Sequence, residues 1–255
     1  MANLLRNVVN WFTEAEKNLY EFLGFVPYCD EHKNVWSPQL LTIFFDVCSQ
    51  LDSLWSWEID KNKRNPIRKN PCIVDYFIHF GSDIASKWAV FWGGSGEKVQ
   101  PFSPWSSLSV SNFTQATWES RKDLELEWWK AYQNVKHNRI KNQEEAKLKY
   151  VVEAICGMFL AIIRCEDCWD ILWEKGWLFF DETQVLSIYP FELLKKDFGR
   201  QCSISILCAE YKIVIETKLF SYPVLYCNKN VQKGSEWDVN ASNRFKAWFR
   251  EYEHK

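Results

Sequence analysis

The stretch Trp128-Trp129-Lys130-Ala131-Tyr132-Gln133-Asn134-Val135-Lys136-His137-Asn138-Arg139 carries the strongest pattern in the chain. It contains no proline or glycine and predicts a helix, which we expect to run from about residue 118 to 141. At about 100° per residue, one flank of this helix is apolar and can pack, namely Leu124, Trp128, Ala131 and Val135. The arc beside it is expected to present ionisable and aromatic groups together: Trp129, Tyr132, Lys136, His137 and Arg139.

The composition is that of a globular protein rich in aromatic rings. Of 255 residues, 47% are hydrophobic and 25% charged, while aromatic residues reach 17% and include 15 tryptophans. Such rings fill cores and also form binding surfaces. The net charge of −2 argues against a protein that coats nucleic acid over its whole surface, although a local basic patch remains compatible with it.

Cysteine usage and hydropathy favour a cytoplasmic protein. Nine cysteines are scattered without a repeat, and several lie in apolar runs, so we expect reduced thiols. The N-terminus lacks the apolar block of a signal peptide. The longest apolar run, residues 154–163, is far short of the roughly 20 residues that span a bilayer, so no membrane association is expected.

Residues 1–175 are expected to form a helical bundle domain. Apolar residues recur at helical spacing over residues 3–23, after Ser37-Pro38, after Pro71 and over 144–169. Ser37 and Pro38 suit the N-cap and first turn of the second helix. The glycines of residues 93–96 lack the context of a phosphate-binding loop and are predicted to form a plain loop. Cys165-Glu166-Asp167-Cys168, a single pair without nearby histidines, is interpreted as structural.

Residues 176–255 are expected to form a small α+β region packed on the bundle. Short β-branched or apolar segments separated by turn-like residues predict antiparallel strands, the clearest at residues 212–217. Residues 241–253 predict a closing amphipathic helix. The predicted fold class is therefore α+β, mostly α, with a helical bundle followed by a small antiparallel β region and a C-terminal helix.

One other segment is strongly basic, residues 61–70. The structural interpretation, which we favour, is that this segment is a solvated connector between helices. The functional interpretation is contact with RNA phosphates, which needs exposed cations without special geometry, and its candidates are Lys63, Arg64 and Arg68.

The histidine of the opening stretch is the best candidate for acid–base chemistry, because only four histidines exist and no nucleophile, metal-ligand or nucleotide motif accompanies them. Attack of a ribose 2′-hydroxyl on the adjacent phosphodiester needs a proton-transfer group near pH 7 and cations for the developing charge. His137 fits the first role and Arg139 the second. Tyr132 could donate a hydrogen bond, Lys136 could contact a phosphate, and Trp129 could stack a base. No metal or cofactor is required.

A structural interpretation stands beside this chemical one. A helix carrying Lys-His-x-Arg can pair with acidic residues on a neighbouring helix, and Tyr132 can cap a buried network. Residue types alone place this brace ahead of an active site.

The opening stretch resembles the W-W-x-x-Y-N-x-V-K-H-x-R motif of a large group of bacterial helical proteins that are similar to HEPN domains. The Ser37-Pro38-Gln39-Leu40 helix start and the helix from Ala146 to Ile163 resemble that group as well, so the resemblance covers roughly residues 35–165. It implies a helical bundle, often a homodimer. His137 matches the histidine of the motif and Arg139 the cation after it, whereas Gln133 stands where the group has asparagine.

Many HEPN domains are metal-independent ribonucleases in toxin–antitoxin, phage-defence and CRISPR-linked systems. Their usual signature is R-x(4–6)-H, but here Tyr132 occupies the position that gives the x4 spacing before His137, and an arginine follows the histidine instead. The resemblance implies an RNA-binding or RNA-cleaving protein, with antiviral defence as its setting. The alternative is a non-catalytic module that docks a protein partner.

Overall fold

The computed structural model describes residues 2–64, 66, 70–84, 90–92, 97–107, 115–180, 211–217 and 220–226. The chain divides into two compact units. The first comprises Met1–Ser86 and Gln100–Ile162, and the second comprises Lys87–Val99 and Ile163–Lys255. In the described part of the chain, no helix is both long and apolar enough to cross a membrane.

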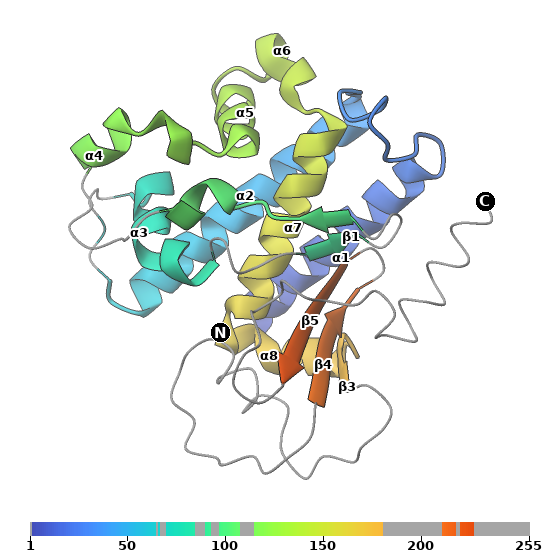
Figure 1. The fold of residues 1–255 in the computed structure, drawn as a ribbon, viewed down its shortest axis with the longest axis vertical. Helices are drawn as coiled ribbons and strands as arrows, with labels where there is room; N and C mark the ends of the chain where they lie inside the picture. Colours follow the sequence, from blue (N-terminus) through green and yellow to red (C-terminus); the bar gives the residue numbers. More distant parts are fainter. Residues whose placement is uncertain are drawn as a thin grey trace. The chain divides into compact units, whose positions relative to one another are not determined.

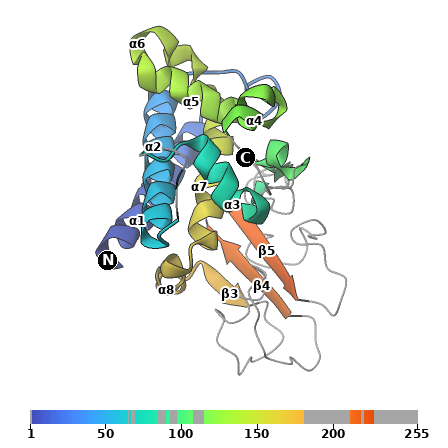
Figure 2. The same ribbon diagram turned by 90° about the vertical axis from the view of Figure 1, so that its left-hand side faces the viewer.

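The first unit is helical. Its helices are α1 (Ala2–Leu23), α2 (Pro38–Lys61), α3 (Ile73–Ile84), α4 (Gln115–Ser120), α5 (Glu127–His137), α6 (Arg139–Asn142) and most of α7 (Leu148–Arg164). Short 3-10 turns occupy Ser103–Ser107, Lys122–Leu124 and Gln143–Glu145. α1, α2 and α7 run alongside one another, and α5 with α6 lies against α2 (Figures 1 and 2).

The sequence signals at the start of α2 act as predicted. The backbone N–H of Leu40 donates to Ser37 Oγ at 3.1 Å, and Pro38 occupies the first turn, where its missing N–H leaves no bond unmade. α1 buries Leu5, Val8 and Phe12 and leaves Glu14 exposed, as its helical spacing predicted.

Aromatic rings form the core where α2, α3 and α5 meet. The fully buried Trp55 ring lies at the centre, with centroid distances between 5.0 and 6.3 Å to Tyr76, Phe80, Phe102, Trp105 and Trp129. At the edge of this cluster, Trp128 Nε1 donates to the Pro101 carbonyl at 2.9 Å. Much of the aromatic content therefore holds the bundle together.

α7 passes close to this cluster at a glycine. A β-carbon at Gly157 would lie 3.2 Å from Phe102 Cζ and 3.4 Å from Trp128 Cη2, so a side chain would press on both rings. The residues around it on α7, from Val151 to Ile163 with the exception of Glu153, are buried. A helix buried on nearly every side is the centre of a bundle.

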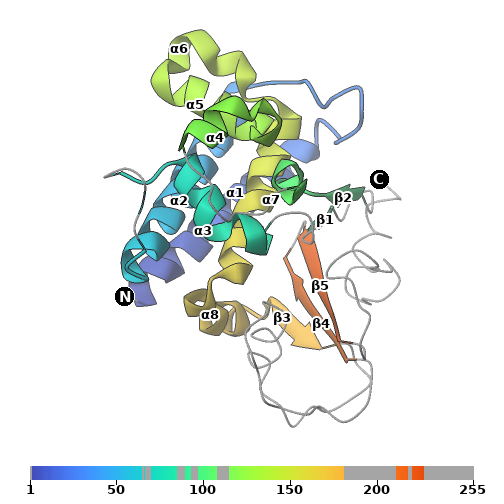
Figure 3. The same ribbon diagram turned by 60° about the vertical axis from the view of Figure 1, so that its left-hand side comes forward.

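The second unit contains α8 (Trp169–Glu174) and a five-stranded antiparallel sheet in the order β2-β1-β5-β4-β3. Its strands are β1 (Val90–Trp92), β2 (Glu97–Val99), β3 (Leu178–Phe180), β4 (Tyr211–Glu216) and β5 (Phe220–Tyr226). β3, β4 and β5 lie side by side in Figure 3, and β1 joins the sheet by pairing with β5 at Phe91 and Ser221.

The predicted fold class, α+β with a helical bundle followed by a small antiparallel β region and a C-terminal helix, is wrong. The described chain is mainly helical, and two strands of the sheet come from residues 90–99, inside the segment expected to be all bundle. Pairing between β1 and β5 joins residues about 130 positions apart, and local periodicity carries no signal for such pairing. The two units accordingly differ from the predicted 1–175 and 176–255. The helix predicted at residues 241–253 lies outside the described residues.

Candidate functional site

The residues of the opening stretch, Trp128 to Arg139, change from buried to exposed along the chain. On α5, Trp128, Trp129, Ala131, Tyr132 and Val135 are at most 4% exposed. From Lys136 to Lys141 every residue is exposed. We call this exposed segment, Lys136–Lys141, the α5–α6 corner. The predicted packing flank is confirmed, whereas the two aromatic residues expected to share the open arc are inside the unit.

Trp129 and Tyr132 are core residues. The Trp129 ring packs edge-on against Tyr76 at a centroid distance of 6.0 Å and against Tyr132 at 5.2 Å. Tyr132 also contacts the Phe45 ring at 6.0 Å, and its hydroxyl lies 3.3 Å from Ser49 Oγ. In this arrangement Trp129 has no open face on which a base could stack, because only 4% of it is exposed.

A group of polar side chains joins α5 to α2 beside these rings. We call it the seam, and it consists of Asp52, Ser56, Tyr76, Tyr132 and Lys136. Lys136 Nζ donates to Asp52 Oδ2 at 3.1 Å, and the Tyr76 hydroxyl donates to the other Asp52 oxygen while lying 2.8 Å from Ser56 Oγ. The ammonium of Lys136 also lies over the Tyr132 ring, 5.4 Å from its centroid. Asp52 therefore gathers a cation and a phenol from two other helices.

Asp52 was not among the residues that sequence reasoning selected. Phe45, Ser49, Asp52 and Ser56 follow the spacing of one helix face, which is the face that meets α5. Two hydroxyls and a carboxylate on the same face as Phe45 are the signal that could have revealed it. The partner helix was not identifiable from the sequence.

The electrostatics of the seam keep its phenols protonated. Burial raises the pKa of Tyr132, against the opposing effects of the Ser49 hydrogen bond and the Lys136 charge. Burial, together with the Asp52 charge, raises the pKa of Tyr76 well above its ordinary value. For Lys136, burial lowers the pKa, but attraction to Asp52 and its hydrogen bond outweigh burial and raise it overall. These groups can donate hydrogen bonds near neutral pH but do not exchange protons there.

The helix ends at His137, so the uninterrupted helix predicted over residues 118–141 is wrong. Asn138, at φ −151° and ψ 80°, closes α5 and caps α6, where its Oδ1 accepts from the Lys141 N–H at 3.2 Å. An asparagine side chain that bonds its own backbone competes with helix continuation. The break turns Arg139 back toward α2, where its guanidinium lies 5.4 Å from the Phe45 ring centroid.

The predicted site residues are therefore only partly brought together. Tyr132, Lys136 and Arg139 gather around Phe45 and Asp52. His137 is exposed, and on a regular helix it lies about 140° around from Tyr132. The corner itself is held by Asn134, whose side chain donates to both oxygens of Glu145 at 3.0 and 2.8 Å and whose carbonyl accepts from Asn142.

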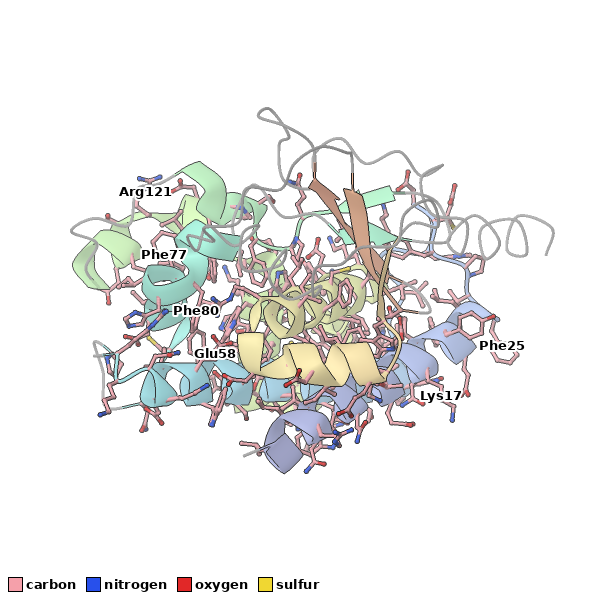
Figure 4. The ribbon with its side chains drawn as sticks, turned by 90° about the horizontal axis from the view of Figure 1, so that it is seen from below. Lys17, Phe25, Glu58, Phe77, Phe80 and Arg121 are labelled. Carbon is pink, nitrogen blue, oxygen red and sulfur yellow. The ribbon has the colours of Figure 1, made fainter. Side chains whose placement is uncertain are left out.

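The basic segment 61–70 is used in part for packing. Arg64 donates to the His79 carbonyl at 2.7 Å and lies over the Phe80 ring at 5.3 Å, so it ties the end of α2 to α3. Figure 4 shows Phe80 on α3 on the same side of the unit as Glu58 of α2. Lys63 is exposed, with the left-handed φ of 50° that turns the chain there, and Arg68 lies outside the described residues.

Neither a family model, nor a curated protein, nor a solved structure matches this chain. The fold and the chemistry of the α5–α6 corner are therefore the basis for any functional conclusion.

Proposed function

We propose that the protein binds RNA through phosphate contacts at the α5–α6 corner, as a HEPN-like module. The observation that carries this proposal is the run of six exposed residues that includes Lys136, His137, Arg139 and Lys141 and contains no acidic side chain. Exposed cations on a projecting surface can follow a phosphate backbone without a shaped pocket.

The same geometry supports binding more than cleavage. Catalysis of 2′-hydroxyl attack would need a proton-transfer group, a hydrogen-bond donor and unpaired cations around one phosphate. Here Tyr132 is buried, and the charge of Lys136 is partly neutralised by Asp52 at 3.1 Å. Of the three residues that the RNA-cleavage hypothesis assigns to catalysis, His137 and Arg139 are exposed and Tyr132 is not.

The test is RNA binding measured by fluorescence anisotropy with a labelled single-stranded RNA, at several salt concentrations and with chelator present. The double variant Arg139→Gln/Lys141→Gln should bind roughly tenfold more weakly, and its salt dependence should flatten by about 1.4 in slope for two lost phosphate contacts. Arg6→Gln/Lys17→Gln is the matched control, because it removes one exposed Arg and one exposed Lys from α1. Equal losses in the two variants would mean that only net charge attracts the RNA, and the proposal would fail.

The same samples decide between binding and cleavage when the RNA is run on a denaturing gel. We expect intact RNA with the unmodified protein and with His137→Ala. Cleavage that occurs in chelator and disappears in His137→Ala, with an unchanged circular-dichroism spectrum, would instead establish the ribonuclease hypothesis.

A second candidate, docking onto a second copy of the chain, is favoured by one observation. Ile140 belongs to the α5–α6 corner and is 88% exposed. Its neighbours along the corner are polar or charged, so Ile140 would anchor an interface where the second copy supplies the apolar side chains that cover it. Phe25, which follows α1 and is equally exposed, provides the control (Figure 4). In sedimentation velocity, Ile140→Ser should reduce any dimer and Phe25→Ser should not; a monomer in all three proteins would reject this candidate.

A further inference from the structure

A second feature of the first unit lies away from the α5–α6 corner, in the groove between α1 and α2. A pocket of about 280 Å³ opens there, with α7 contributing Met158. Its walls are two facing helix stripes, since Trp11, Glu14 and Asn18 of α1 follow helical spacing, as do Thr42, Asp46 and Gln50 of α2. All of its lining residues belong to the described part of the chain.

The charges around this pocket have one sign. Of its ten lining residues, Glu14 and Asp46 are the ionisable ones, and each is an exposed carboxylate on a different helix. The neighbouring Thr42 hydroxyl donates to the Pro38 carbonyl at 3.1 Å, so its remaining capacity is to accept. The rim therefore offers acceptors and negative charge from both walls and favours a ligand that carries donors and positive charge.

The rest of the pocket is apolar and aromatic. Ile43, Val47 and Met158 are at most 4% exposed and form the floor. Trp11, 45% exposed, stands at the edge with part of its ring open to solvent. An indole face attracts cations, most strongly when they are partly desolvated, and an apolar floor accepts methylene groups.

We propose that this pocket binds a linear alkyl diamine or a longer polyamine. One ammonium would pair with Glu14 and the other with Asp46, while the methylene chain covers the floor and Trp11 contacts a cationic end. α1 and α2 are in contact, and the axes of such helices lie about 8–10 Å apart, so a short alkyl chain can reach from one wall of the groove to the other. The pocket volume also suits such a slender ligand better than a nucleotide.

The experiment uses the full chain and isothermal titration calorimetry at low ionic strength, with 1,5-diaminopentane as the probe. The diamine should bind, pentylamine should bind more weakly, and 1,5-pentanediol should not bind measurably. Glu14→Gln and Asp46→Asn should each weaken diamine binding roughly tenfold, a loss expected for one charge-assisted contact. Nα-Acetyl-lysine amide, whose ε-ammonium is its one cation, tests whether the site instead takes a basic side chain of a peptide; equal or tighter binding of this compound would overturn the diamine proposal.

Matched controls separate a site from general surface charge. Glu21→Gln and Asp60→Asn remove exposed carboxylates from the same two helices, outside the pocket lining. These variants should bind the diamine as the unmodified protein does. Losses equal to those of Glu14→Gln and Asp46→Asn, or binding of the diol as tight as that of the diamine, would overturn the proposal. Trp11→Leu should weaken binding of the diamine and leave the thermal melting temperature nearly unchanged.

Discussion

The two ends of the α5 stretch differ in burial. From Trp128 to Val135 the helix contributes rings and aliphatic groups to a core that also takes Trp55 from α2 and Tyr76 from α3. From Lys136 onward the same stretch is exposed, and it breaks at Asn138 into a four-residue helix. One continuous motif therefore contains a packing element and a surface element.

This difference separates the residues that stabilise the fold from those that are available for binding. The tryptophans and the tyrosine of the motif are explained by packing, since each is nearly fully buried. Packing does not explain the exposed His137 and Lys141. Substitutions at the two ends should accordingly affect different properties, stability at one end and binding at the other.

The largest effect is expected from Trp129→Ala. Removing this ring opens a cavity against Trp55, Tyr76 and Tyr132, and such changes cost about 3–5 kcal/mol of the free energy of unfolding. Guanidinium denaturation measures the loss. Trp11→Ala, at a ring 45% exposed, is the control and should cost about 1 kcal/mol or less. Similar losses for the two tryptophans would show that Trp129 is not the core residue described.

The carboxyl group of Glu153 on α7 makes the stability of the fold depend on pH. Burial raises the pKa of Glu153 on α7 to about 7, with Lys149 opposing the shift and Glu127, in the first turn of α5, adding to it. The folded protein then binds more protons than the unfolded chain between the ordinary carboxyl value of 4.5 and about 7, so its stability falls as the pH rises through that window. Glu153→Gln removes this dependence. Its stability advantage over the unmodified protein should grow by about 2–3 kcal/mol from pH 5 to pH 8.

Chemical denaturation at closely spaced pH values measures this difference. Glu119→Gln, at an exposed position on α4, is the control and should follow the unmodified protein. A constant difference between Glu153→Gln and the unmodified protein at every pH would contradict the raised pKa.

A smaller loss of stability is expected at Tyr132, which lies near the boundary between the buried and the exposed end of α5. Tyr132→Phe keeps the ring packing against Phe45 and Trp129 but removes the hydroxyl that lies 3.3 Å from Ser49 Oγ. The expected loss is about 1 kcal/mol, the net contribution of one hydrogen bond. Ser49→Ala in the same background should cost little more, because the partner is already gone. Clearly additive losses in the double variant would mean that the two hydroxyls are not coupled.

Local sequence predicted which residues of the stretch could pack, but not how many helices would cover them. Leu124, Trp128, Ala131 and Val135 are buried, as the helical spacing required. Trp129 and Tyr132 are buried as well, because α2 and α3 cover the arc that the sequence left open. Which further faces of a helix become buried depends on tertiary packing. Helical periodicity in the sequence indicates only the face on which apolar residues recur regularly.

The sequence indicated which residues of the candidate site could be exposed. It did not indicate their contact partners or the helix break between them. Lys136, His137 and Arg139 are exposed, but the Asp52 partner of Lys136 lies 84 residues away in sequence. The break at Asn138 was missed for a related reason, because asparagine is compatible both with a helix interior and with a cap. Long-range partners of this kind require the fold.

The smallest predicted effect tests whether the corner is independent of the core. Lys136 and Asp52 form an ion pair whose side chains are 42% and 25% exposed, so Lys136→Gln should cost less than about 1 kcal/mol, and high salt should reduce the difference further. Asp52→Asn should cost more, since Asp52 also accepts the Tyr76 hydroxyl from the core side. A double-mutant cycle between the two positions, followed by urea denaturation, isolates the pair. A coupling energy well above 1 kcal/mol would show that Lys136 belongs with the buried half of α5 and would favour the brace, whereas a small one leaves its charge available to an RNA phosphate.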